Sequence, residues 1–150
     1  MTSTSSTETQ EFLDSTLPRQ IEAERAIHNG DVAPRVAMWS RNDPLTLFGA
    51  WISGSGWEEL KPVFDQVAAN FADCTSYDVE LLAAGASGDL AYTVCYEHTT
   101  ASVNGRPRKY TLRVTHVYRR EGGEWKIVHR HGDELSREEV PAPEPAPASA

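Results

Sequence analysis

The stretch KYTLRVTHVYRREGGEWKIVHRHGD, residues 109–133, decides the fold. Apolar and polar residues alternate along both of its arms, and the Gly122-Gly123 pair between them is typical of the tight turn of a β-hairpin. Alternation along the second arm places Trp125, Ile127, His129 and His131 on one face. We therefore predict two long antiparallel strands that end in a histidine pair.

The segments before this hairpin divide into a helical half and a strand half. Apolar residues recur at helical spacing over residues 12–27, 34–39 and 57–71, whereas residues 77–81 and 90–98 alternate as strands do. Residues 45–48 predict a short strand, residues 49–56 a loop, and Asn104-Gly105 a tight turn. Helices followed by antiparallel strands predict an α+β domain with its helices on one face of the sheet.

Composition separates both ends of the chain from the domain. Residues 1–9 are mostly Ser, Thr and Glu, with almost nothing to bury, so we expect them to be disordered. Residues 136–150 form a Pro- and Ala-rich tail that we expect to be disordered and extended. The domain is therefore expected to span residues 10–135, which is long enough for one hydrophobic core.

The charge of the chain excludes several classes of partner. Its formal net charge of −8 argues against nucleic acid and against an anionic membrane surface, both of which bind clustered Lys and Arg. No apolar run approaches the roughly 20 residues that span a bilayer, and residues 1–10 lack the features of a secretory signal. We therefore expect a cytoplasmic protein in which Cys74 and Cys95 stay reduced.

Three segments carry a resemblance to a known family: AIHNGDVAPRVAMWS, AYTVCYEH and RVTHVYRREGGEWKIVHRHGD. In this order and spacing they resemble the nuclear transport factor 2-like superfamily, and within it the SnoaL-like and ketosteroid isomerase-like proteins. The hairpin is also similar to the association domain of calcium/calmodulin-dependent protein kinase II. The resemblance covers residues 10–135. It implies a cone-shaped fold in which three N-terminal helices pack on a curved antiparallel sheet and enclose a pocket.

The resemblance also implies which face of each strand lines the pocket. It places these side chains inward: Tyr92, Val94, Tyr96, His98, Arg113, Thr115, His129, His131 and Asp133. The opposite parity, with Leu112, Val114, His116 and Tyr118, would face solvent or a partner.

The catalytic residues of ketosteroid isomerase do not carry over to this chain. Phe48 stands where that family has its general base, and Thr115 stands where it has the protonated Asp. The position of the family's Tyr falls near Glu24. The resemblance therefore argues against steroid isomerase chemistry.

Two kinds of side chain could perform chemistry in such a pocket. His131 and His129 could act as an acid/base pair, as histidines do in the related scytalone dehydratase, with Asp43 or Asp133 orienting the ring. Arg113 would need a buried anion, which is either a ligand carboxylate or an internal acid such as Glu24, Glu97 or Asp133. Further ligand contacts are expected from Thr115, Tyr92, Tyr96, His98, Trp39 and Trp51, although such aromatic residues also form plain core.

These residues support three hypotheses about function. The first is a cofactor-free isomerase, cyclase or dehydratase-like lyase that acts on a small organic molecule with a carboxylate or carbonyl. The second is a ligand-binding module without chemistry, and the third is an oligomeric association domain. A homodimer through the outer face of the sheet is compatible with all three. His129 and His131 with Asp133 or His98 could also bind a metal, but we expect neither a metal nor a cofactor.

Overall fold

The computed structural model describes residues 4–135, and its elements follow the predicted α+β order. The helices are α1 (Thr4–Ile27), α2 (Ala33–Met38) and α3 (Trp57–Asn70). The strands are β1 (Thr46–Phe48), β2 (Ser53–Ser55), β3 (Phe71–Ser87), β4 (Leu90–Val103), β5 (Arg106–Glu121) and β6 (Glu124–Glu134). None of the helices in this part of the chain is long and apolar enough to cross a membrane.

Two boundaries differ from those expected from composition. Helix α1 begins at Thr4, so residues 4–9 are helical although their composition predicted disorder. Strand β2 forms inside the segment 49–56 that was expected to be a loop. The predicted tail, residues 136–150, lies outside the described residues.

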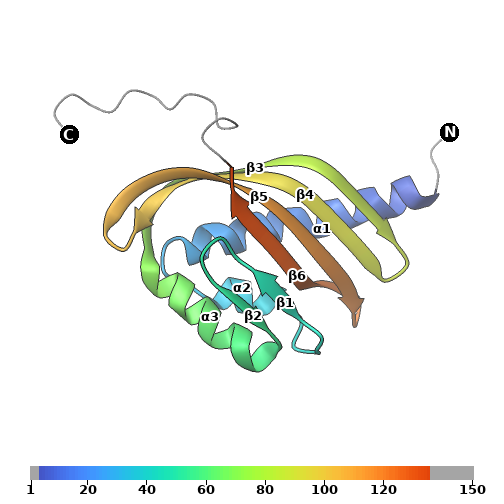
Figure 1. The fold of residues 1–150 in the computed structure, drawn as a ribbon. Coiled ribbons are helices and arrows are strands. Elements are labelled where there is room, and N and C mark those ends of the chain that lie inside the picture. The colour runs from blue at the N-terminus through green and yellow to red at the C-terminus, as the bar shows by residue number, and fades with distance from the viewer. Residues whose placement is uncertain (1–3, 136–150) are drawn as a thin grey trace.

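The six strands form one curved sheet in the order β2-β1-β6-β5-β4-β3 (Figure 1). All neighbours are antiparallel except β1 and β6, which run parallel. The predicted hairpin is confirmed as β5 and β6, and both turn glycines have positive φ, 57° at Gly122 and 81° at Gly123. Only glycine adopts such angles without steric cost, so these two residues fix the turn.

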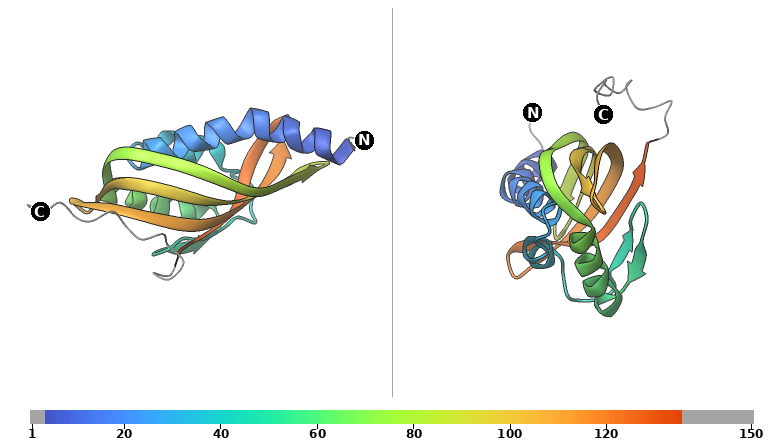
Figure 2. Two further views of the ribbon diagram at one scale, coloured as in Figure 1. Left: turned by 90° about the horizontal axis from the view of Figure 1, so that it is seen from above. Right: turned by 90° about the vertical axis from the view of Figure 1, so that its left-hand side faces the viewer.

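The three helices cover the concave face of this sheet. Figure 2 shows α1 lying along the curved strands β3, β4 and β5. Phe12 of α1, Phe64 of α3 and Tyr118 of β5 belong to one buried cluster, and the Phe12 and Tyr118 rings meet edge to face at 4.9 Å. The helices and the sheet therefore share a single core, which is the arrangement predicted from the order of the elements.

The alternation along the strands is confirmed, but the face assigned to the interior is wrong. Leu112, Val114, His116 and Tyr118 of β5 are buried, whereas Arg113 is exposed. On β4 the buried parity is Ala91, Thr93, Cys95, Glu97 and Thr99, and Tyr92 is 45% exposed. On β5 the alternate residues that carry the larger apolar side chains are the buried ones, as the hydrophobic effect requires.

A β-bulge in β6 changes which residues of the second arm share a face. Val117 pairs with His129 and Tyr118 with Ile127, so Val128 is the extra residue. Trp125 and Ile127 are buried before the bulge and Arg130 after it. The expectation that Ile127, His129 and His131 share one face is therefore wrong.

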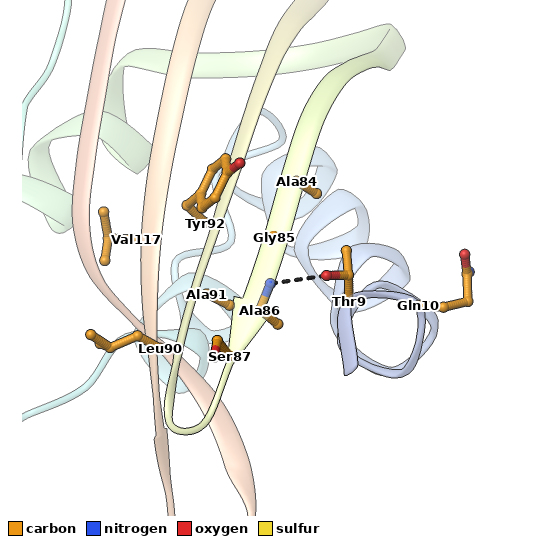
Figure 3. Close-up of a pocket in the computed structure, with 10 residues that line it drawn as sticks. All are labelled: Thr9, Gln10, Ala84, Gly85, Ala86, Ser87, Leu90, Ala91, Tyr92 and Val117. Atoms are coloured by element: carbon orange, nitrogen blue, oxygen red, sulfur yellow. Dashed lines mark hydrogen bonds between the residues drawn. The ribbon is translucent and has the colours of Figure 1, made fainter. Parts of the chain in front are cut away.

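Helix α1 also protects one of the two edges of the sheet, strand β3. The hydroxyl of Thr9 accepts a hydrogen bond from the Ala86 N–H at 3.1 Å (Figure 3), and Glu8 accepts one from Gly88 at 2.9 Å. Arg25 donates to the Tyr77 carbonyl at 3.3 Å near the other end of the strand. These contacts occupy backbone groups that an exposed edge would offer to another chain.

Candidate functional site

A network of buried charges occupies the centre of the concave face. Arg130 of β6 donates to both oxygens of Glu97, at 2.9 Å each, and to Glu24 of α1 at 3.0 Å. Arg35 of α2 donates to the other oxygen of Glu24. The four side chains are between 0% and 7% exposed. Two carboxylates and two guanidiniums thus meet inside the domain with their formal charges balanced.

The arginines keep both acids ionised in spite of their burial. Desolvation by itself would raise the pKa of Glu97, but the guanidinium of Arg130 holds that pKa below its ordinary value. Burial likewise opposes ionisation of Glu24, whose pKa Arg35 and Arg130 together hold below its ordinary value. The network is therefore a charged, paired cluster at neutral pH.

His116 lies behind this cluster on β5. Burial and the adjacent Arg130 lower the pKa of His116 well below its ordinary value, so the ring is neutral. Its Nε2 accepts a hydrogen bond from Arg130 at 3.2 Å, which assigns the proton to Nδ1. That Nδ1 has no hydrogen-bond partner among the described residues.

A small cavity of about 60 Å³ lies beside this cluster, between the helices and the sheet. Its polar lining comes from four residues: His28, Arg35, Tyr110 and Arg130. The rest is mainly apolar and comes from β1, the turn between β1 and β2, α3, the start of β3, and β5, including Leu47, Trp51, Ile52, Val67 and Phe71. The lining combines apolar surface with a few convergent polar groups, as small-molecule sites do, and the volume suits only a ligand of a few non-hydrogen atoms.

His28 and Tyr110 form a hydrogen-bonded pair in this cavity. The Nδ1 of His28 lies 2.6 Å from the Glu24 carbonyl oxygen, and the Nε2 lies 3.0 Å from the Tyr110 hydroxyl. Burial lowers the pKa of His28, so the ring is neutral at neutral pH. A carbonyl oxygen can only accept, so Nδ1 carries the proton and Tyr110 donates its hydroxyl proton to Nε2.

Arg35 faces the same cavity with unused donors. Its guanidinium carbon lies 5.5 Å from the centre of the Phe64 ring, which holds the side chain against α3. Within residues 4–135, its hydrogen bonding is limited to the contact between Nη2 and Glu24. The Nε and Nη1 donors therefore remain available to a ligand oxygen.

The residues expected to form the site lie together, but on the outer face of the sheet. Arg113 donates to both oxygens of Asp133, at 2.8 and 3.1 Å, and both side chains are about half exposed. With His131, Thr115 and Tyr96 they line a shallow depression of about 280 Å³. Their placement in an interior pocket was wrong, because the sheet turns this parity outward.

His129 and His98 have separate partners on the same outer surface. His129 contacts the Thr46 hydroxyl at 2.7 Å, and Phe48 meets the rings of His129 and His131 edge to face. His98 lies 2.8 Å from the Thr111 hydroxyl and 3.1 Å from Glu80. These contacts fix the outer histidines on the sheet surface, away from the interior cavity.

Four other residues that were expected at the site lie apart from one another: Trp39, Trp51, Tyr92 and Asp43. Trp39 is part of the buried core, whereas Trp51 is 56% exposed at the cavity and lies edge-on to Tyr110 at 5.8 Å. Tyr92 lies over Gly85 of β3 in an open groove of about 830 Å³ (Figure 3). Asp43 accepts a hydrogen bond at 3.0 Å from the N–H of Trp57, the first residue of α3. It thus acts as a helix cap and lies outside the cavity lining.

Sequence reasoning missed the interior residues or gave them other roles. His28 was available as the only histidine before the strands, and Arg35 as a cation among Val36 and Met38. Glu97, a lone acid in an alternating strand, was considered only as a partner for Arg113. The signal common to all three was an ionisable side chain on an otherwise buried face, which requires a partner.

Comparison with known proteins identifies the family. Residues 22–133 match the SnoaL-like domain family. The sequence matches no curated protein.

Solved structures share the fold at low sequence identity. A putative dehydratase of the NTF2-like family from Streptomyces avermitilis superposes with a TM-score of 0.71 at 17% identity, covering 85% of this chain and 98% of that one. A putative calcium/calmodulin-dependent protein kinase type II association domain from Thiobacillus denitrificans gives 0.68 at 18%, covering 81% and 96%. A ketosteroid isomerase-like protein from Erwinia carotovora gives 0.66 at 19%, covering 84% and 98%. These identities establish a common fold only, whereas the family match over residues 22–133 shows that this chain belongs to the SnoaL-like domain family.

Proposed function

We propose that the protein is a cofactor-free isomerase or dehydratase-like lyase that acts on a small molecule with a carboxylate or carbonyl. The observation that carries the proposal is the His28–Tyr110 pair, which shares an apolar cavity with the unused donors of Arg35. This combination replaces the outer residues His131 and Arg113 in the roles of acid/base and anion anchor. The similarity to a putative dehydratase of the same fold agrees with this class of reaction.

The chemistry needs one proton movement and one stabilised charge. The neutral His28 ring, directly or through the Tyr110 hydroxyl, takes a proton from the carbon next to the substrate carbonyl. The electron pair left behind moves onto the carbonyl oxygen, where the Arg35 guanidinium stabilises it. Return of the proton to another carbon gives an isomer, and its delivery to a departing hydroxyl gives water and an alkene.

Deuterium exchange tests this proposal without a known substrate. Short-chain keto acids and hydroxy acids are incubated with the protein in D₂O, and NMR reports deuterium at the carbon next to the carbonyl. His28→Asn should lower the exchange rate by about 100-fold or more, since acid–base catalysis contributes roughly 10² to 10⁴. Arg35→Gln should act in the same direction, while His131→Ala and Arg113→Gln should leave the rate unchanged.

The controls make this test decisive. Loss of exchange in His131→Ala with retention in His28→Asn would place the chemistry on the outer face and refute the assignment. Binding of a keto acid without any exchange or product would instead support the non-catalytic ligand-binding module.

A second candidate function, an association domain, rests on the apolar outer face. Leu82, Leu90 and Tyr92 are between 45% and 57% exposed on strands β3 and β4. Exposed apolar residues grouped in this way are typical of surfaces that bind a partner, and a second copy of the chain is the partner we propose. Light scattering should give a dimer that Tyr92→Lys converts to a monomer, whereas Trp51→Ser, equally exposed but at the cavity, should leave it intact. A monomeric wild-type protein would remove this candidate.

A further inference from the structure

The hydrogen-bond chain at the cavity has a fixed direction in the free protein. The Glu24 carbonyl accepts from Nδ1 of His28, so Nε2 must accept from the Tyr110 hydroxyl. With its proton directed at His28, the Tyr110 oxygen has only lone pairs to offer to other partners. An anion that entered the cavity would meet those lone pairs, which repel it.

The charges around His28 lead to the same conclusion. The charged and titratable groups that surround it come from every neighbouring element: Glu24 of α1, Arg35 of α2, Tyr77 of β3, Glu97 of β4, Tyr110 of β5 and Arg130 of β6. Two acids and two arginines cancel, and both tyrosines are neutral because burial raises the pKa of each. A bound carboxylate would leave one uncompensated negative charge in a buried site, which is strongly unfavourable.

We infer that a small carboxylate enters this cavity together with one proton, which His28 takes at Nε2. The chain then reverses: His28 Nε2–H donates to the Tyr110 oxygen, and the Tyr110 hydroxyl donates to one carboxylate oxygen. The other carboxylate oxygen accepts from the unused donors of Arg35. One proton comes from solvent and no bond to carbon changes, so the site effectively binds the neutral acid.

This inference rests on the proposed function and extends it. Because burial lowers the pKa of His28, the free protein holds no proton at Nε2, and a proton is taken up from solvent when the ligand binds. A proton taken up in this way stays within hydrogen-bond reach of the substrate. Transfer of this proton through the Tyr110 hydroxyl to the carboxylate returns His28 to the neutral form that the base step of the proposed function requires.

Calorimetry with matched probes tests the proton uptake. Propionate and its neutral analogue propionamide are titrated into the full-length protein at about pH 7 in buffers with different ionisation enthalpies. We expect propionate to take up about one proton per site and propionamide none. The Kd for propionate should rise about tenfold per pH unit above neutrality, and the Kd for propionamide should stay constant.

Two further measurements assign the proton to its residue. In ¹⁵N NMR spectra of the wild-type protein, Nε2 of His28 should change from an unprotonated to a protonated shift when propionate is added. His28→Asn keeps a donor toward the Glu24 carbonyl and should bind propionate more weakly and without proton uptake, whereas His131→Ala and Arg113→Gln should retain the uptake.

The outcomes separate this inference from the proposed function. Propionate binding with no proton exchange, or uptake that persists in His28→Asn, overturns the inference and leaves the proposed function standing. If neither probe binds at the cavity, the inference and the anion-anchor role of Arg35 both fall.

Discussion

Replacing Glu97 by Gln should destabilise the fold more than any surface change of the same size. The substitution conserves shape but removes the negative charge that Arg130 meets through two hydrogen bonds of 2.9 Å. The Glu97 side chain is 0% exposed and that of Arg130 is 6% exposed, so water cannot replace the lost partner. The buried cluster would change from balanced to a net positive charge.

The expected loss of stability follows from this burial. Breaking a buried pair from one side costs about 3–5 kcal/mol, because the remaining charge stays desolvated. For a domain of this size, that loss corresponds to a fall in Tm of roughly 10–15 °C. The double variant Glu97→Leu with Arg130→Met removes both charges and leaves Glu24 paired with Arg35. It should recover about 2 kcal/mol or more of the loss.

Chemical denaturation measures both variants under the same conditions. The free energy of unfolding is obtained for the wild type, Glu97→Gln and the double variant, with Arg113→Gln as a control for an exposed ion pair. We expect the control to lose less than about 1 kcal/mol. A loss of the same small size in Glu97→Gln, or a double variant less stable than the single one, would refute the description of this cluster as a balanced buried network.

Three further predictions concern acid stability, strand packing and helix capping. Because the folded state lowers the pKa of His28 and of His116, the unfolded chain binds more protons, so the free energy of unfolding should fall as pH drops below about 6.5, the ordinary histidine pKa. Stability that is unchanged between about pH 7 and 5 would contradict this. Gly85→Ala would place a Cβ 2.7 Å from the Tyr92 ring and should lower the free energy of unfolding, measured by thermal denaturation, by about 1 kcal/mol. The double variant Gly85→Ala/Tyr92→Ser should recover this stability, and an equal loss in it would argue against the contact. Asp43→Ala should cost about 1 kcal/mol and Asp43→Asn much less, since Asn keeps the acceptor for the first N–H of α3; equal losses would exclude the cap.

The architecture was predictable because local signals agree with one another. The Gly122-Gly123 turn has both residues at positive φ, and the alternation around it gives the two strands that the structure contains. The order of helices before strands gives the α+β class in the same way. Strand β2 was missed because its sequence, Ser-Gly-Ser, has little strand propensity and pairs only with the short strand β1.

The choice of inner face was not predictable from alternation alone. On β4 the buried parity contains Thr93, Cys95 and Glu97, while the exposed parity contains two tyrosines and a valine. Hydrophobicity therefore indicates the wrong face of this strand. Glu97 is buried because Arg130, 33 residues away, supplies its partner, and no local pattern contains that information.

The bulge at Val128 likewise made the inner face of β6 unpredictable from alternation. A single extra residue turns His129 and His131 outward and Arg130 inward relative to Ile127. Its position depends on pairing with β5, which a single strand does not specify. The interior cavity therefore holds a histidine and an arginine, His28 and Arg35, other than those expected at the site.

A crystal structure of the protein soaked with propionate tests the location of the site most directly. We expect electron density for the carboxylate in the interior cavity, with one oxygen at the Tyr110 hydroxyl and the other at the guanidinium of Arg35. Density on the outer face beside Arg113 and His131, with an empty interior cavity, would contradict the assignment.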